Sequence, residues 1–258
     1  MGRHEPRRWP VCMSLFSSRV SSDPIAALCA SAILIAVASN PTSFVRADRP
    51  KGSVLLFGSS SMNGSFGHLI ADDLGRLGYQ IERRGYAAAG LARPDFRDLQ
   101  QTIAECRIDR STAAVVFYVG ANDGQSIWLP PEERVNPDDP PWVGWHDDRW
   151  SAIYEQRATK LIKSVCARGA RNAIVLPPAD VPSARLQSRL DRIRPLLQRA
   201  ARATDCGRFV PTAGDRGRFV IDGEALRSAD SVHMTRPGAQ RVWERIRHVI
   251  LALMMPRS

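Results

Sequence analysis

The sequence predicts an α/β protein in which one mainly parallel sheet lies between two layers of helices. Short apolar segments of strand length alternate along the chain with longer segments whose apolar residues recur at helical spacing. Residues 113–119 are almost continuously apolar, as expected of a strand that is buried on both faces of a sheet. Strands that alternate with helices build a parallel sheet covered on both sides, so the expected architecture is a three-layer α/β/α sandwich.

The expected elements follow one another in a regular order, and no internal repeat interrupts them. The strands are predicted at 54–57, 79–84, 113–119, 172–176 and 209–211. The helices are predicted at 62–77, 94–106, 150–165 and 183–204, with a last helix that begins at 235–237. Sheets of this kind bind ligands at the carboxyl ends of their strands. The turns that follow the first three strands are therefore where a site is expected.

A long segment, residues 125–149, is rich in proline, tryptophan and acidic residues. A loop of this length inside a compact domain is usually functional or disordered, and the tryptophans argue against disorder. We therefore predict an ordered loop beside the carboxyl end of the third strand. Its tryptophans could stack on a sugar ring or pin the loop to the body of the domain, and the sequence leaves both open.

The first fifty residues look like a targeting segment. Several arginines precede an apolar run at 25–38, and 45–47 offers small residues at the positions of a cleavage site. The run is shorter than the roughly 20 residues that a membrane span needs. We therefore predict that residues 1–47 are a signal peptide cleaved after Ala47, and that residues 48–258 are a periplasmic or secreted domain. The alternative is an uncleaved leader that anchors the domain to the inner membrane, facing the periplasm.

Charge and cysteine content bear on the partners of the chain. The formal net charge is +10, but the arginines are spread along the predicted helices and no zinc-finger or RNA-binding signature is present. We therefore expect no specific nucleic-acid partner, although a basic surface could attract anionic polymers of the cell envelope. Three cysteines, Cys106, Cys166 and Cys206, follow the leader and allow at most one internal disulfide. No pair of them has the spacing of metal ligands, and no metal is expected.

The turn after the first strand carries the candidate nucleophile. The apolar run stops at Gly58, and three serines follow where a helix would begin, a position whose backbone N–H groups favour negative charge. We take Ser60 as the nucleophile. His233 is the natural base among five histidines, since the others lie in the leader or in predicted helices, apart from His146 in the tryptophan-rich loop. Asp230 can hold the far N–H of the His233 ring, which completes a catalytic triad.

Donors for an oxyanion are expected at the ends of the neighbouring strands. The side chain of Asn122 can donate an N–H beside the backbone N–H groups of Ser60 and Gly90. Gly90 suits this role because a residue without Cβ allows close approach of the backbone. Each of these motifs alone is weak evidence for a catalytic site. The order of the motifs along the chain, each at a predicted strand end or before the last helix, is much more specific.

These blocks, taken together, resemble the SGNH (GDSL-type) hydrolase superfamily over nearly the whole predicted domain. The matching blocks are Gly58-Ser59-Ser60, then Gly90, then Gly120-Ala121-Asn122-Asp123, and last Asp230-Ser231-Val232-His233. The chain is most similar to a bacterial periplasmic or envelope branch described as a domain of unknown function. The segments that carry this closer similarity are 90–95, 120–125, Trp150 with Tyr154 and Arg157, and 222–235. The resemblance implies a flavodoxin-like α/β/α fold and serine-ester chemistry without a metal or cofactor.

One position departs from the superfamily pattern. The first block usually reads Gly-Asp-Ser, and Ser59 stands here in place of the aspartate. That aspartate is not the acid of the triad, so its replacement bears on the tuning of the nucleophile loop more than on catalysis itself. The change also makes Ser59 or Ser61 a possible nucleophile. The alignment of Gly58 and Met62 favours Ser60.

Three further residues lie near the predicted site. Arg93, Asp123 and Gln125 match positions of the closer branch, and we predict that they bind substrate. For the positions near the site that are typical of the closer branch, a role in helix capping and surface ion pairs is at least as consistent with the sequence; these positions are Arg93, Asp95, Gln125 and Arg157.

The resemblance implies an exported serine esterase or O-acyltransferase that acts on acyl esters, foremost acetyl esters, of envelope carbohydrate or on small esters. The alternative is a non-catalytic envelope or polysaccharide-binding protein with the same fold. A third hypothesis, binding of anionic polymers or nucleic acid, rests on charge alone.

Overall fold

The computed structural model describes residues 51–255, which form a sheet with its strands in the order β2-β1-β3-β6-β7. All neighbouring strands in this sheet run parallel. They are β1 (Ser53–Ser59), β2 (Gln80–Tyr86), β3 (Thr112–Tyr118), β6 (Ala173–Leu176) and β7 (Gly207–Phe209). The predicted leader at 1–47, its cleavage after Ala47 and the domain boundary at residue 48 lie outside the described residues. Between residues 51 and 255, the helices lack the combination of length and apolarity needed to cross a membrane.

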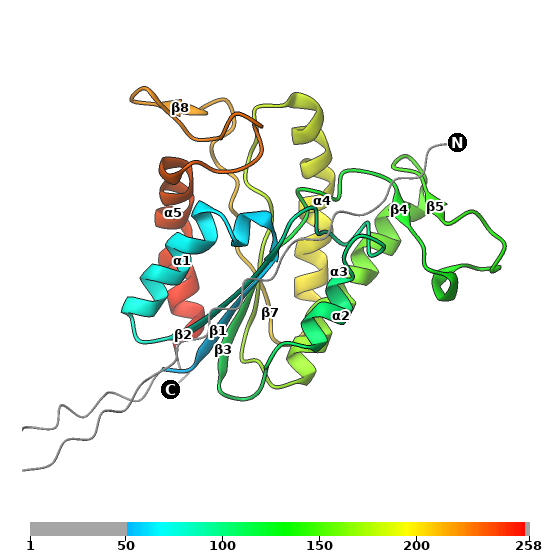
Figure 1. Cartoon of the computed structure of the whole chain (residues 1–258), viewed down its shortest axis with the longest axis horizontal. Helices are drawn as coiled ribbons and strands as arrows, with labels where there is room; N and C mark the ends of the chain where they lie inside the picture. Colours follow the sequence, from blue (N-terminus) through cyan, green and yellow to red (C-terminus); the bar gives the residue numbers. More distant parts are fainter. Residues whose placement is uncertain (1–50, 256–258) are drawn as a thin grey trace, which may run out of the picture. The chain divides into compact units, whose positions relative to one another are not determined.

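Helices cover both faces of the sheet (Figure 1). The first face carries α1 (Ser65–Arg76) and α5 (Arg236–Met254), and the second carries α2 (Leu99–Ala104), α3 (Arg149–Ala167) and α4 (Ala184–Arg202). Side chains of β1 alternate between the two cores, with Val54 and Leu56 packed toward α1 and α5, and Leu55 and Phe57 packed toward the other helices. The predicted three-layer α/β/α fold is confirmed.

The first two helices begin later than the sequence predicts. The chain after β1 makes a 3₁₀ turn, η1 (Ser60–Met62), in which the N–H groups of Asn63 and Gly64 both donate to the carbonyl of Ser60. Because of this tight turn, α1 begins only at Ser65. The helix predicted from Pro94 starts only at Leu99, because the side chain of Asp98 accepts the N–H groups of the next turn and caps the helix there.

The tryptophan-rich segment is ordered, but it contains a hairpin that the sequence did not indicate. Its strands β4 (Ile127–Trp128) and β5 (Trp142–Val143) pair in antiparallel fashion, with a 3₁₀ turn, η2 (Pro131–Glu133), between them. A second short hairpin, β8 (Val220–Ile221) with β9 (Glu224–Ala225), precedes α5. Strands of two residues are too short to show the alternation from which a strand is predicted.

A disulfide between Cys166 and Cys206 links the end of α3 to the residue before β7. It is the one internal disulfide that the cysteine count allows, and Cys106 is a free, buried thiol. Because the bond closes a loop spanning 40 residues, we expect its loss to lower the free energy of unfolding by about 4 kcal/mol. The double variant Cys166→Ala/Cys206→Ala should therefore melt roughly 10 °C below the wild type, as measured by circular dichroism.

Cys106→Ala is the matched control for this prediction, because it removes the free thiol and leaves the disulfide. Dithiothreitol should lower the melting temperature of the wild type and of Cys106→Ala alike, and should leave the double variant unchanged. A wild type that melts at the same temperature with and without dithiothreitol, once the bond is shown to be reduced, would contradict the stabilising role.

Candidate active site

The candidate nucleophile lies at the abrupt turn where β1 ends. Gly58 has φ +145, and a Cβ at this residue would lie 2.3 Å from the carbonyl oxygen of Tyr118, so the turn requires glycine. Ser60 begins the 3₁₀ turn directly after the strand. Its Oγ lies 2.7 Å from Nε2 of His233, a residue 173 positions further along the chain. The fold thus brings the predicted serine and histidine into hydrogen-bond contact.

The three neighbouring serines differ in their surroundings. Ser59 is 1% exposed, and among the described residues its hydroxyl has no hydrogen-bond partner. Ser61 is 9% exposed. Ser60 is half-buried and bonded to the histidine. Of the three hydroxyls left open by the sequence, Ser60 is the one in position to be activated by a base.

The loop before α5 holds the histidine and its acid in one compact turn. Ser231 has φ 61, a left-handed conformation that turns the chain sharply between Asp230 and His233. Oδ1 of Asp230 accepts the backbone N–H groups of Val232 at 2.9 Å and of His233 at 3.0 Å. Its Oδ2 lies 2.5 Å from Nδ1 of His233. Thr235 then caps α5 by accepting the N–H of the third following residue, Gly238.

The charge of Asp230 determines which nitrogen of His233 carries the proton. The hydrogen bond with His233, together with the N–H group of Val232, holds the pKa of the Asp230 carboxyl well below its usual range. An ionised carboxylate only accepts hydrogen bonds, so Nδ1 of the neutral ring is the nitrogen that carries hydrogen. Nε2 is then the acceptor for the hydroxyl of Ser60. This arrangement allows the ring to take the serine proton as a base.

Two of the three candidate oxyanion donors, Gly90 and Asn122, lie in the loops that follow β2 and β3, the two strands beside β1. The last residue of β2, Tyr86, is the register partner of Ser59, so the chain toward Gly90 leaves the sheet beside the serine turn. Asn122 follows β3 and donates one N–H of its amide to the carbonyl of Ala89 at 2.9 Å. The amide has a second hydrogen for an oxyanion. This bond ties the Asn122 side chain to the loop that contains Gly90.

Asp123, which the sequence predicted to bind substrate, is instead a buried support of this loop. Its side chain is 0% exposed. One carboxyl oxygen accepts the N–H of Ala92 at 2.9 Å, and the other accepts the hydroxyl of Tyr154 at 2.9 Å. A Cβ at Gly90 would lie 2.1 Å from Oδ1 of Asp123. Burial raises the pKa of this carboxyl to about 6, against the lowering effect of its hydrogen bonds. A side chain enclosed in this way does not reach substrate.

Arg93 and Gln125 are also engaged with neighbouring protein groups. Arg93 forms two hydrogen bonds with the carboxylate of Asp95, at 2.8 and 2.7 Å, and its guanidinium lies over the ring of Trp142. The Gln125 amide donates to the carbonyl of Asn122 at 2.6 Å. These contacts order the loops around the site, and both side chains remain partly accessible.

Two tryptophans of the long segment, Trp145 and Trp142, differ in their surroundings. Trp145 packs edge-on against the fully buried Trp150 of α3, which stacks on Tyr154, so Trp145 anchors the segment to α3. The indole N–H of Trp150 also donates to the carbonyl of Gln125 at 2.7 Å. Trp142, by contrast, is 46% exposed. Of the two roles left open by the sequence, anchoring is the one taken by Trp145.

Two side chains of α3 have supporting roles that the sequence did not assign. The Tyr154 hydroxyl holds Asp123, and the Arg157 guanidinium donates to the carbonyls of Leu91 and Trp128 at 2.8 and 2.7 Å. The available signals were the similarity of both residues to the closer family branch and their spacing of three residues on one helix, which puts both on the same face. Within residues 51–255, no group of three or more histidine, cysteine, aspartate or glutamate side chains is arranged to hold a metal ion.

Residues 53–248 match the family model described as "Protein of unknown function (DUF459)". The chain belongs to the DUF459 family. Among curated proteins, no sequence matches this DUF459 chain.

Solved structures similar to the DUF459 chain include several esterases. A catalytic mutant of Axe2, an acetylxylan esterase from Geobacillus stearothermophilus, is 17% identical with a TM-score of 0.53, over 81% of this chain and 96% of that one. A carbohydrate esterase family 3 protein from Talaromyces cellulolyticus is 13% identical with a TM-score of 0.52, over 80% and 100% of the two chains. A member of the lipolytic protein G-D-S-L family from Veillonella parvula is 13% identical with a TM-score of 0.50, over 76% and 97%. The DUF459 chain therefore has the SGNH fold, and the predicted resemblance is confirmed.

Proposed function

We propose that this DUF459 protein is a serine esterase or O-acyltransferase that acts on acyl esters of carbohydrate, with acetyl as the foremost acyl group. The observation that carries the proposal is the continuous chain of short contacts from Ser60 Oγ to His233 Nε2, at 2.7 Å, and from His233 Nδ1 to Asp230 Oδ2, at 2.5 Å. A hydroxyl, an imidazole and a carboxylate in this order are the groups that acyl transfer through serine requires.

In the first half of the reaction, Ser60 Oγ attacks the ester carbonyl carbon while His233 Nε2 takes the hydroxyl proton. The carbonyl oxygen gains negative charge, which the N–H groups of Gly90, Ser60 and Asn122 would stabilise. The tetrahedral intermediate then collapses, and the bond between the carbonyl carbon and the leaving oxygen breaks. His233 returns its proton to that oxygen, which leaves as an alcohol, and Ser60 remains acylated.

In the second half, an acceptor hydroxyl attacks the acyl-enzyme and His233 takes its proton. Collapse of the second intermediate restores the Ser60 hydroxyl with that proton and releases the acylated acceptor. Hydrolysis and transfer share these steps and differ only in the acceptor, which is water in one and a sugar hydroxyl in the other. Asp230 stabilises the imidazolium in both halves.

A carbohydrate substrate and a location outside the cytoplasm are part of the proposal. Two of the similar structures are named an acetylxylan esterase and a carbohydrate esterase, which supports an acylated sugar as the substrate class. The predicted leader supports export to the periplasm or beyond. So does the Cys166–Cys206 disulfide, since such bonds persist in oxidising compartments.

Covalent labelling with a fluorophosphonate probe tests the proposal. The probe reacts with an activated serine, so we expect the wild type to be labelled and Ser60→Ala to lose labelling completely. Ser59→Ala and Ser61→Ala are matched controls, because each removes a neighbouring hydroxyl, and both should remain labelled. Folded wild-type protein that takes up no label would reject the serine-hydrolase mechanism.

A non-catalytic, polysaccharide-binding protein is the second candidate. The serine at position 59, where SGNH hydrolases usually have aspartate, is the observation that favours it. This candidate predicts an unlabelled protein that nevertheless retains polysaccharide on an affinity gel. Labelling that depends on Ser60 would exclude it.

A further inference from the structure

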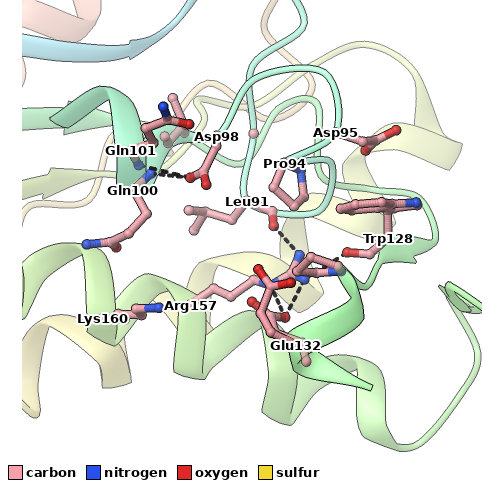
Figure 2. A pocket seen from close by; sticks show the side chains of 14 residues that line it. Leu91, Pro94, Asp95, Asp98, Gln100, Gln101, Trp128, Glu132, Arg157 and Lys160 are labelled. Carbon is pink, nitrogen blue, oxygen red and sulfur yellow. Dashed lines mark hydrogen bonds and ion pairs between the residues drawn. The ribbon is translucent and has the colours of Figure 1, made fainter. Parts of the chain in front are cut away.

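A cavity of about 300 Å³ lies against the loop that carries Gly90. Its wall is formed by this loop, the beginning of α2, the chain from β4 to η2, and the outer face of α3 (Figure 2). Gly90 and Leu91 both line it. Gly90 is also one of the three candidate oxyanion donors, so one residue is shared by the cavity wall and the candidate active site.

The cavity is held open by the protein itself. The Arg157 guanidinium donates to the carbonyl of Leu91 on one wall and to the carbonyl of Trp128 on another, and it pairs with Glu133 at 2.6 Å. Figure 2 shows this side chain between the two walls that it joins. On the far side, Asp98 is fixed as the cap of α2. A site that is already formed needs little ordering when a ligand binds.

The lining combines apolar surfaces with polar groups that have no protein partner. Leu91, Pro94 and the ring of Trp128 supply the apolar part. Gln100 and Gln101 also line the cavity, and within residues 51–255 neither side-chain amide has a hydrogen bond. A sugar ring has this same division, with C–H faces that pack on apolar side chains and hydroxyls that exchange hydrogen bonds with amides and carboxylates.

The charge of the lining limits which sugars fit. Asp95 is paired with Arg93, and Glu133 is paired with Arg157. Of the remaining charged residues in the lining, Asp98 and Glu132 carry negative charge and Lys160 carries positive charge, so the lining is slightly acidic although the whole chain has a net charge of +10. An anionic sugar or phosphate would be repelled by these carboxylates, whereas uncharged hydroxyls can donate to them.

We propose that this cavity is a subsite for an uncharged sugar unit of the acylated substrate. This inference rests on the proposed function and adds the part of the substrate beyond the ester. The acyl group would lie at Ser60, and the sugar that carries it would extend past Gly90 into the cavity. Its volume is at the lower end of the range for small-molecule sites, about 300–1,000 Å³, which suits one or two sugar rings.

The test compares two substrates in each variant. One is p-nitrophenyl acetate, which has no sugar, and the other is an acetylated, uncharged xylo-oligosaccharide. In Gln100→Ala/Gln101→Ala, we expect kcat/KM for the oligosaccharide to fall about tenfold, mainly through KM, while kcat/KM for p-nitrophenyl acetate stays within about twofold. Trp128→Ala should shift the ratio of the two values in the same direction. A tenfold change corresponds to about 1.4 kcal/mol.

Gln156→Ala is the matched control, because this exposed glutamine of α3 does not line the cavity. It should leave both substrates unaffected. An acidic oligosaccharide that carries uronic acid groups should be a poorer substrate for the wild type than the uncharged one.

Each other outcome has a defined meaning. If the wild type turns over p-nitrophenyl acetate but not the oligosaccharide, or if the glutamine variants leave the ratio unchanged, the subsite is rejected and the esterase mechanism stands. A preference of the wild type for the acidic oligosaccharide would reject an uncharged ligand. If neither substrate is turned over and no probe labels Ser60, the proposed function itself fails.

Discussion

Replacing His233 with alanine is expected to lower kcat/KM for p-nitrophenyl acetate by at least about a thousandfold. The reason is that Nε2 of this ring is 2.7 Å from Ser60 Oγ and is the group positioned to take its proton. Without the ring, the serine must react as an unactivated hydroxyl. Steady-state kinetics on purified protein measures the loss, and circular dichroism shows whether the variant is folded.

His146→Ala is the control for this prediction. His146 is exposed in the tryptophan-rich segment and is the other histidine that the sequence put near the strand ends. It should retain wild-type turnover. Asp230→Asn should also lose turnover, by about 10²-fold to 10⁴-fold, because the side chain keeps its size but an amide can hold the ring in the wrong tautomer. Unchanged turnover in His233→Ala would refute the assignment of the base.

The sequence predicted the core of this site because its chemistry follows the topology of the sheet. Ser60 comes directly after β1, and Gly90 and Asn122 lie in the loops after β2 and β3, the two strands adjacent to β1 in the sheet. Parallel strands end at one edge, so knowledge of the strands alone brings these residues together. The loop of Asp230 and His233 required more, since it follows no long strand. Its prediction depended on the order of the blocks along the chain.

The roles of the supporting residues could not be predicted, because they depend on contacts between distant segments. Asp123 looks like a polar turn residue in sequence, yet the hydroxyl of Tyr154 and the N–H of Ala92 enclose it. A pattern of polar and apolar letters does not show that a carboxylate is buried. Likewise, the cysteine count allowed one disulfide without saying that Cys166 pairs with Cys206.

Helix starts were the least predictable part of the fold, for a local reason. Pro94 and Asp95 are residues that often begin a helix, but Asp95 is paired with Arg93 and the capping contact is made by Asp98. Asp95 and Asp98 are both suitable as the N-cap of this helix, and only the contacts in the folded structure show that Asp98 is the one that caps it.

Asp123→Ala is the second substitution expected to have a large effect. It leaves the N–H of Ala92 and the hydroxyl of Tyr154 buried without their partner, which costs roughly 2–4 kcal/mol of stability. It also frees the loop of Gly90, whose backbone rests against the Asp123 carboxylate. We expect kcat to fall about a hundredfold, as for the loss of one oxyanion donor, with little change in KM. Urea unfolding and steady-state kinetics measure the two effects.

Asp123→Asn separates the position of this side chain from its charge. The amide keeps the shape, and its oxygen can still accept from Ala92, so kcat should return to within about fivefold of the wild type. A variant that folds stably but loses as much kcat as Asp123→Ala would show that the negative charge itself is needed, and would contradict a positioning role.

The wild type and Asp123→Asn should differ in how the free energy of unfolding depends on pH. Burial raises the pKa of Asp123 from 3.8 to about 6, so folding favours the protonated carboxyl. The stability that this preference supplies is fully present below about pH 4 and is lost as the pH rises through 6, a change of about 3 kcal/mol. Asparagine does not titrate. The free energy of unfolding of the wild type, measured relative to that of Asp123→Asn, should therefore fall by about 3 kcal/mol as the pH rises from 4 to 7. If the free energies of unfolding of the two proteins depend on pH in the same way, the burial of a titrating carboxyl at the oxyanion loop is contradicted.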